Sequence, residues 1–129
     1  MSKITKGSCN CGNVKWEAEG ELRGILACHC GQCRKQTGLY YAATNVSDDR
    51  LRLVSDSTLK WYQSSDVAKR GFCGECGSAM FWKHSADDFT SILVGSIDGP
   101  TGLEIVEHIF TDDKPDWYEI TDGKPIRPQ

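Results

Sequence analysis

Cysteine is the residue type in this chain best suited to chemistry, and its spacing is unusual. All seven cysteines of the 129-residue sequence fall into three short motifs, CNC, CHCGQC and CGEC. Clustered thiolates at such spacings are typical metal ligands, above all for zinc. The start, MSKITKGSCN, has no apolar signal-peptide core, so we expect a reducing, cytoplasmic environment in which disulfides are disfavoured. The cysteines therefore predict metal sites.

The segment FCGECGS at 72–78 is typical of a zinc-ribbon knuckle. Its turn directs two sulfurs at one ion, and the glycine after the second cysteine lets the backbone curl around it. One knuckle supplies half a site, and SCNCG at 8–12 is the natural other half. We therefore expect a closed structural zinc site made by Cys9, Cys11, Cys73 and Cys76. The unfolded chain has no preformed site, so the binding energy would largely become folding energy.

Three cysteines remain in CHCGQC: Cys28, Cys30 and Cys33. Three protein ligands and one exchangeable position are the usual arrangement of catalytic zinc. In an extended CxC segment, the sulfurs of Cys28 and Cys30 point to the same side of the backbone. The tight turn at GQC would then bring the sulfur of Cys33 close to both. The alternatives are an iron–sulfur cluster, a redox thiol pair at CGQC, or a second closed site completed by a histidine. The histidines available for that closed site are His29, His84 and His108.

The segments that must position these motifs are predicted to be strands. Short stretches rich in β-branched and aromatic residues are separated by Gly, Asp, Ser and Asn. We expect strands near 14–18 and over 39–46, 51–54, 58–64, 78–84 and 89–97. Helical turns are expected only at CRKQTG (33–38) and near KPDWYEI (114–120). The sequence thus predicts one mainly β, antiparallel domain over 1–129, whose turns between strands carry the cysteines.

Composition and charge exclude several function classes. The chain is 39% hydrophobic and 26% charged, which is ordinary for a globular protein. No apolar run approaches the roughly 18 residues of a membrane span. The formal net charge is −3, and seven ionised thiolates with two doubly charged ions would make the domain more negative. Without a basic stripe, such a domain repels phosphate, so we expect no nucleic-acid partner.

The order of the motifs resembles that of the glutathione-dependent formaldehyde-activating (GFA) family, which includes the centromere protein V domain. The matching pieces run from about residue 7 to about 125: CxC, CHCxxCRKxTG, FCGxCGS, VGSIDGP, EHIF and KPDWYEI. The resemblance implies a β-tent fold and two zinc ions per chain. It implies a structural zinc on the four cysteines named first, and a second zinc on Cys28, Cys30 and Cys33 whose coordination a glutathione-type thiol completes.

A thiol that enters a vacant position on such an ion loses its proton near neutral pH and stays nucleophilic. It can attack an aldehyde to give a hydroxymethyl thioether, and the reverse path breaks the same carbon–sulfur bond. We therefore predict a carbon–sulfur lyase-type enzyme whose partners are glutathione or a similar thiol and formaldehyde or another small aldehyde. The alternative is a non-enzymatic interaction module with two closed zinc sites, since fold does not fix function.

A substrate like glutathione carries carboxylates, so cations near the site matter. Arg34 and Lys35 directly follow the three cysteines, and Arg34 is favoured because its planar guanidinium suits bidentate contact. Lys69 and Arg70 lead into the knuckle and are further candidates. The alternative is that these cations are solvated surface groups or donors to metal-bound sulfurs.

Four residues in the other motifs have weaker functional signals. Asp98 and His108 lie in segments that match the family, and we expect structural or supporting roles before general acid–base roles. Trp82 and Trp117 are expected to be core aromatics and not a substrate wall.

Overall fold

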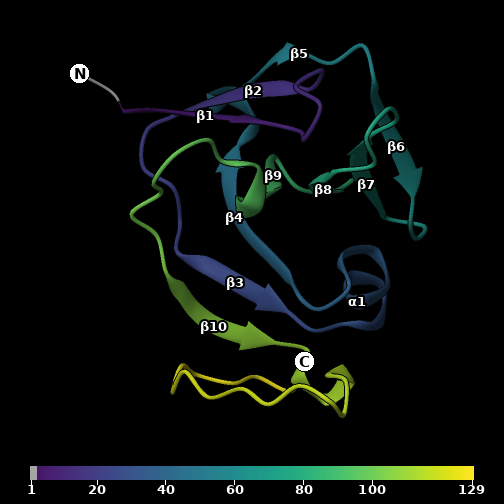
Figure 1. Cartoon of the computed structure of the whole chain (residues 1–129), viewed down its shortest axis with the longest axis vertical. Coiled ribbons are helices and arrows are strands. Elements are labelled where there is room, and N and C mark those ends of the chain that lie inside the picture. The colour runs from purple at the N-terminus through teal and green to yellow at the C-terminus, as the bar shows by residue number, and fades with distance from the viewer. Residues whose placement is uncertain (1–2) are drawn as a thin grey trace. The chain divides into compact units, whose positions relative to one another are not determined.

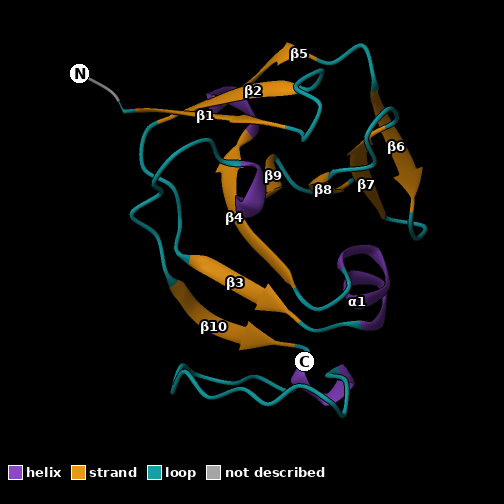
Figure 2. Ribbon diagram, in the orientation of Figure 1, coloured by secondary structure: helices purple, strands orange, loops and turns teal. Residues whose placement is uncertain are grey.

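The computed structural model describes residues 3–129, and the chain is mainly β-strand, as predicted (Figures 1 and 2). The chain forms two compact units. Unit 1 contains the chain up to Arg23 together with Thr44–Thr101, and unit 2 contains Gly24–Ala43 and Gly102–Gln129. The CNC and CGEC motifs fall in unit 1 and CHCGQC falls in unit 2. Each group of cysteines is therefore built within one unit.

Unit 1 holds two runs of hydrogen-bonded strands. The first is a three-stranded sheet in the order β1 (Ile4–Ser8), β2 (Lys15–Glu19) and β5 (Leu51–Ser55). The second begins with β4 (Tyr41–Ser47), which belongs to unit 1 from Thr44 onward. It continues with β9 (Phe89–Leu93), β8 (Ala79–His84), β7 (Ala68–Cys73) and β6 (Leu59–Gln63). Short 3₁₀ helices cover Asp48–Arg50 and Val94–Ser96. Hairpin pairing of β7 with both β6 and β8 is antiparallel, which brings the turn after Cys73 to one end of this sheet.

The core of unit 1 is built around β2. Val14, Trp16 and Ala18 alternate with polar residues, and each is at most 1% exposed. The indole of Trp16 lies across Gly7 on the neighbouring strand, and its Nε1 donates a hydrogen bond to Ser96 Oγ at 3.1 Å. The same buried cluster includes two cysteines, Cys9 and Cys73. The CNC and CGEC turns are therefore anchored to the core by one cysteine each.

In unit 2 a short strand lies between two neighbouring strands that run in opposite directions. β3 (Ile25–Cys28) pairs in parallel with β10 (Ile105–Ile109) and antiparallel with the start of β4. Figure 1 shows β3 and β10 side by side, running the same way, with the C-terminal segment beside β10. Helix α1 (Gly31–Thr37) follows β3, and a 3₁₀ helix covers Thr111–Asp113. Both CHCGQC and the EHIF segment thus converge at the carboxyl ends of two parallel strands.

Several expectations differ from the structure. The strand expected over 89–97 ends at Leu93, because Ser96 Oγ donates to Leu93 O and the chain turns into a 3₁₀ helix. The predicted helical turn at 33–38 is present as α1, but the segment 114–120 has no helix and only follows the 3₁₀ turn. The expected antiparallel domain is confirmed for most strand pairs, and β10 is the exception, since it pairs in parallel with β3. In the part of the chain that the structure describes, no helix is long and apolar enough to cross a membrane.

Candidate metal centres

The four cysteines of unit 1 lie on two similar turns. Cys9 directly follows β1, and Cys73 is the last residue of β7. Each turn closes on a glycine with positive φ: Gly12 (82°) donates its N–H to Cys9 O at 3.0 Å, and Gly77 (79°) donates to Cys73 O at 2.8 Å. This conformation is open to glycine and strained for other residues. The two glycines explain why a cysteine pair can curl around one point in each turn.

The sulfurs of this group lie at the spacing that zinc requires. Cys9, Cys11, Cys73 and Cys76 each offer a ligand atom within 4.8 Å of the others. The Sγ–Sγ distance is 3.6 Å between Cys9 and Cys11 and 3.7 Å between Cys11 and Cys73. Four ligands about 2.3 Å from a tetrahedral zinc ion are separated by about 3.8 Å. The four sulfurs can therefore hold such an ion with little movement.

Neighbouring hydroxyl groups favour ionised sulfur at two of these positions. Ser78 Oγ lies 3.2 Å from Cys76 Sγ, and the side chain and backbone of Ser78 are the main cause that lowers the pKa of Cys76 to about 5. Thr58 Oγ1 lies 3.3 Å from Cys73 Sγ and is the main cause of the lowered pKa of Cys73. Cys76 is thus a thiolate near neutral pH before any cation binds, and the thiolate form of Cys73 is favoured relative to a free cysteine.

Cys11 shows the opposite shift. The backbone near Asn13 lowers its pKa, but burial and the neighbouring sulfurs outweigh this and raise the pKa to about 12. Crowded sulfurs cannot all ionise without a cation, because like charges repel at this distance. A doubly charged ion would reverse that balance and deprotonate a coordinating thiol. The four-cysteine group therefore has the electrostatics of a metal site.

The tricysteine group of unit 2 is built by the end of β3 and the start of α1. Cys28 is the last residue of β3, Cys30 is the N-cap of α1, and Cys33 lies in its first turn. The N–H of Cys33 donates to Cys30 Sγ at 3.3 Å, and Gly38 in the left-handed conformation ends the helix. Cys33 is 4% exposed, whereas Cys28 and Cys30 are half-buried. The short helix thus fixes two of the three sulfurs relative to each other.

The donor set of this group suits a thiophilic ion. The three ligand atoms lie within 4.8 Å of one another, and within residues 3–129 the group has no fourth ligand. Hydrogen bonds with the Cys30 and Cys33 sulfurs are the main cause that raises the pKa of Cys28, so the thiols suppress one another's ionisation. The Cys30 and Cys33 sulfurs are 2.9 Å apart, so an ion between them requires this edge to open to about 3.8 Å.

A buried hydrogen-bonded chain adjoins the tricysteine group. His29, between two of the cysteines, has its Nε2 2.9 Å from Nδ1 of His108 on β10. His108 Nε2 in turn lies 2.8 Å from Asp122 Oδ2 in the C-terminal segment. Both imidazoles are 0% exposed. The parallel pairing of β3 with β10 sets His108 opposite Ala27, which brings the two rings together.

Two tyrosines pack on the ring of His29. The centroid of Tyr40 lies 5.2 Å from that of His29, and the ring of Tyr118 stacks on it at 6.0 Å. Burial is the main cause that lowers the pKa of His29, and electrostatic interactions with His108 and Lys114 add to the shift. The hydrogen bond from His108 is the main cause that lowers the pKa of Asp122. His29 is thus a neutral ring at neutral pH, and Asp122 is ionised.

The predicted cations are divided between the two units. Arg34 and Lys35 lie in α1, in the same unit as the tricysteine group. Nε of Arg34 is buried and has no hydrogen-bond partner within residues 3–129, whereas Lys35 is exposed. Lys69 and Arg70 lie in β7 of unit 1, where Lys69 Nζ sits over the ring of Trp61 and Arg70 is 5% exposed.

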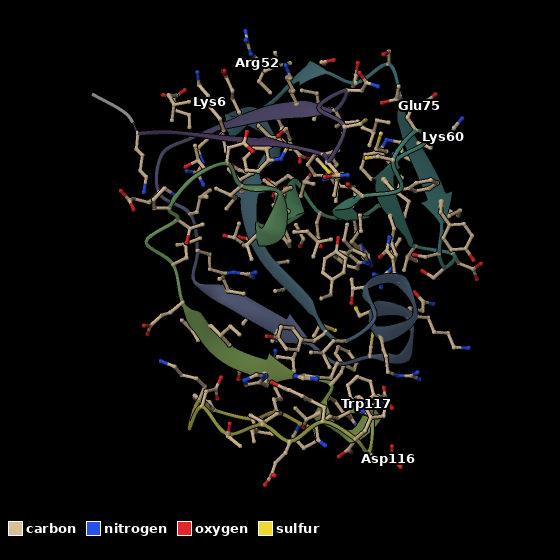
Figure 3. The ribbon with its side chains drawn as sticks, viewed as in Figure 1. Lys6, Arg52, Lys60, Glu75, Asp116 and Trp117 are labelled. Atoms are coloured by element: carbon tan, nitrogen blue, oxygen red, sulfur yellow. The ribbon has the colours of Figure 1, made fainter. Side chains whose placement is uncertain are left out.

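The remaining predicted residues have mixed outcomes. Asp98 accepts a hydrogen bond from Ser8 Oγ at 2.9 Å beside the CNC turn. Trp82 is half-buried in β8, but the expected core position of Trp117 is wrong, since it is 67% exposed in an irregular segment (Figure 3). Sequence reasoning missed Asp122, whose only signal was its place in a TDG turn after KPDWYEI.

Comparisons with known proteins agree with this geometry. The family model described as glutathione-dependent formaldehyde-activating enzyme matches residues 4–113. A Halomonas elongata protein, provisionally named a glutathione-dependent formaldehyde-activating enzyme, is 30% identical over 91% of this chain and 81% of its own length. An uncharacterized lyase of Schizosaccharomyces pombe is 24% identical over 89% of this chain and 84% of its own. A crystal structure of a Rhodobacter sphaeroides protein superimposes with a TM-score of 0.63 at 28% identity, covering 75% of this chain and 91% of that one. The chain therefore belongs to the glutathione-dependent formaldehyde-activating enzyme family.

Proposed function

We propose that this protein is a zinc-dependent carbon–sulfur lyase-type enzyme. It joins a thiol such as glutathione to formaldehyde or another small aldehyde, and it cleaves the resulting hydroxymethyl thioether. The observation that carries this proposal is the tricysteine group, which supplies three soft ligands and has no fourth protein ligand within residues 3–129. Membership of the family and a lyase-named relative support the same reaction class.

The two cysteine groups have different roles in this proposal. Cys9, Cys11, Cys73 and Cys76 hold a structural zinc ion, since four thiolates close the tetrahedron. Cys28, Cys30 and Cys33 hold the second zinc ion. That ion would supply a cation beside which an added thiol loses its proton near neutral pH. The chain's own contribution is to hold the three sulfurs together at the end of β3 and the start of α1, with Cys28 and Cys30 half-buried.

The proposed reaction balances without an oxidant or reductant. The S–H bond of the thiol breaks, and the sulfur electron pair forms a bond to the carbonyl carbon. The π electron pair of the carbonyl passes to oxygen, which takes up one proton to become a hydroxyl group. The reverse reaction returns that proton and breaks the same carbon–sulfur bond. Every atom of thiol and aldehyde is retained in the adduct.

Arg34 and Lys35 are the proposed contacts for the substrate carboxylates. Arg34 lies one residue after Cys33, and its buried Nε lacks a hydrogen-bond partner in the part of the chain that the structure describes. A guanidinium pairs a carboxylate with two parallel hydrogen bonds, which gives direction as well as charge. Lys35 is exposed on the same helix and adds charge with little geometric preference.

The test combines a coordination measurement with turnover. Zinc-loaded protein is expected to contain two ions per chain, and zinc X-ray absorption is expected to change at one ion when glutathione is added. Exchange between glutathione, formaldehyde and the adduct, followed by NMR, is expected to be faster than the uncatalysed exchange. Cys33→Ser is the matched control and should retain one ion without acceleration. The proposal would be contradicted if the coordination of both ions stayed unchanged when glutathione is added and the exchange with formaldehyde were not accelerated. That result would favour a two-zinc interaction module.

A further inference from the structure

We propose that Ile109 limits the size of the aldehyde that the tricysteine group accepts, because its side chain lies beside that of Cys28 on the same face of the sheet. Tyr41 lies on the other side of Cys28 and forms a second, fixed wall. The assignment rests on the proposed function and deepens it. It predicts that an aldehyde without a carbon substituent is preferred over larger ones, and it names the side chain that is responsible.

The strand pairing of β3 fixes which side chains flank Cys28. Cys28 pairs with Ile109 of β10 on one side and with Tyr41 of β4 on the other. Paired residues of neighbouring strands point to the same face of a sheet, and the strands lie about 4.8 Å apart. The side chains of Ile109 and Tyr41 therefore lie directly beside that of Cys28. All three residues belong to unit 2.

Contacts on the opposite face of the sheet agree with this orientation. Side chains alternate along an extended strand, so His29 points away from the cysteine before it. His29 Nε2 lies 2.9 Å from His108 Nδ1, and the ring centroid of Tyr40 lies 5.2 Å from that of His29. His108 and Tyr40 directly precede Ile109 and Tyr41 in the sequence. Because both rings gather with His29 on one face, Ile109 and Tyr41 lie on the other.

Burial distinguishes the two side chains that flank Cys28. Along 25–30 every second side chain is buried, and those between them, which include Cys28 and Cys30, are half-buried. Ile109 is also half-buried, whereas Tyr41 is 4% exposed. Tyr41 is thus fixed by packing, and Ile109 is the side that a substrate group can reach. The β-branched side chain of Ile109 has few rotamers, so it does not yield readily to a larger group.

The proposed carboxylate contacts decide which part of the adduct meets Ile109. Arg34 and Lys35 lie in α1, so they direct the peptide part of glutathione toward the helix. The sulfur of the adduct has one other substituent, which is the carbon that came from the aldehyde. With the peptide part at α1, this carbon lies on the strand side, beside Cys28. A group added to that carbon then competes with the side chain of Ile109 for the same space.

The kinetic test compares formaldehyde with acetaldehyde, which carries one more methyl group. We expect wild type to prefer formaldehyde, in kcat/KM for adduct formation, by more than the uncatalysed reactions differ. Ile109→Ala is expected to reduce this preference about 10-fold, and Ile109→Val less, since one methyl group in a pocket changes kcat/KM by roughly that factor. Ile109→Val also keeps the test decisive if Ile109→Ala does not fold.

The matched control removes the same atoms from the same strand at another position. Ile105 is half-buried like Ile109, but it pairs with Ile25, three residues before Cys28. Three residues of a strand span about 10 Å, so Ile105 lies away from the sulfur. Ile105→Ala is therefore expected to keep the wild-type preference for formaldehyde.

A binding measurement tests the same contact without turnover. S-ethylglutathione has the shape of the formaldehyde adduct, with a methyl group in place of the hydroxyl group. S-isopropylglutathione has the shape of the acetaldehyde adduct in the same way. In calorimetric titration of zinc-loaded protein, we expect wild type to bind the ethyl compound at least about 10-fold more tightly. Ile109→Ala should bring the two dissociation constants to within about 2-fold, and Ile105→Ala should keep the wild-type ratio.

The outcomes separate this assignment from the proposed function. An active wild type without preference between the aldehydes, or an unchanged preference in both Ile109 variants, would overturn the assignment alone. An equal change in Ile105→Ala would do the same, because the effect would not be local to Cys28. If an active protein binds neither thioether, the aldehyde preferences decide. No accelerated exchange and no binding of glutathione or its thioethers would contradict the proposed function, and the role of Ile109 with it.

Discussion

At the scale of single residues, the cysteines differ in what surrounds their sulfurs. Cys73 and Cys76 have hydroxyl neighbours that favour the thiolate, and Cys73 is 0% exposed within the core of unit 1. Cys28 and Cys30 are half-buried and have mainly one another as neighbours. The surroundings of Cys73 and Cys76 suit a permanently bound structural ion. The surroundings of Cys28 and Cys30 suit an ion that a substrate can reach.

This difference predicts unequal effects of two matched substitutions. Cys73→Ser removes a ligand of the proposed structural ion, whose binding energy is comparable with the whole stability of a domain, so we expect unit 1 not to fold. Cys33→Ser is expected to keep the fold, lose one ion and lose turnover by at least about 100-fold. Metal analysis per chain and circular dichroism measure both outcomes. Equal unfolding by the two variants would contradict the division of roles.

The proposed carboxylate contact is tested at Arg34. Arg34→Ala is expected to raise KM for glutathione about 10-fold or more, since it removes a charge-assisted pair, and to leave kcat little changed. The same variant should not affect 2-mercaptoethanol, a thiol without carboxylates. Lys35→Ala, on the exposed side of α1, is the matched control and should have the smaller effect. An unchanged KM for glutathione in Arg34→Ala would remove this residue from the substrate site.

The residues of the site were predictable where a short motif marks them, even when two motifs that form one group lie far apart in the sequence, as Cys11 and Cys73 do. The cysteine groups follow from motif spacing, because the turns that aim the sulfurs are encoded within a few residues. The link from His29 to His108 spans 79 positions and exists only because β10 pairs in parallel with β3. Asp122 adds a further partner from a turn that carries no motif of its own.

At the scale of elements, alternation identified the strands with one buried face. β2 and β8 were predictable because apolar side chains occupy every second position or form an aromatic run. β3 has only four residues, which is too short for a clear alternation of apolar and polar side chains. In β7 the alternation is obscured because a charged residue, Arg70, is buried next to a glycine. Their pairing is decided by neighbouring strands, and local sequence does not record it.

The packing between β1 and β2 gives a prediction about Gly7. A Cβ atom at this position would lie 2.2 Å from the indole of Trp16, which is 1% exposed and cannot swing away. We expect Gly7→Ala to lower the free energy of unfolding by about 1–3 kcal/mol. Gly95→Ala is the control, because nothing lies within 4 Å of its added carbon. Urea unfolding of the two variants checks this, and equal midpoints would contradict the described contact.

The start of the 3₁₀ helix after β4 gives a pH-dependent prediction. Burial would raise the pKa of Asp48, but hydrogen bonds from Lys83 and Thr90 hold it below its ordinary value of 3.8. A folded pKa below the unfolded one contributes stability above pH 3.8, which is lost as the pH falls through the folded value. We expect wild type to be more stable than Asp48→Asn at pH 6, and the gap to close toward pH 2. Urea midpoints at both pH values measure the gap, and a gap independent of pH would contradict the assignment.

At the scale of the whole molecule, each cysteine group is local to one compact unit. The net charge of the chain is −3, and some of its basic residues pair with acids, such as Lys124 with Glu104 and Arg127 with Glu107. Nothing in this distribution marks a phosphate-binding face in the described residues. The ions are therefore the features expected to decide how the molecule responds to its surroundings.

Because each ligand set lies within one unit, stepwise removal of metal should change hydrogen exchange one unit at a time. A mild chelator is expected to take the ion from the half-buried tricysteine group first and to raise amide exchange in β3 and α1. A stronger chelator should then remove the ion held by Cys9 and Cys73, with exchange rising in β1 and β7. The free energy lost in the second step should be the larger one, since that ion joins two buried turns far apart in sequence. Exchange by mass spectrometry with metal counting at each step measures this order. Loss of both ions together, with simultaneous exposure of β1 and α1, would show that the two sites are not independent.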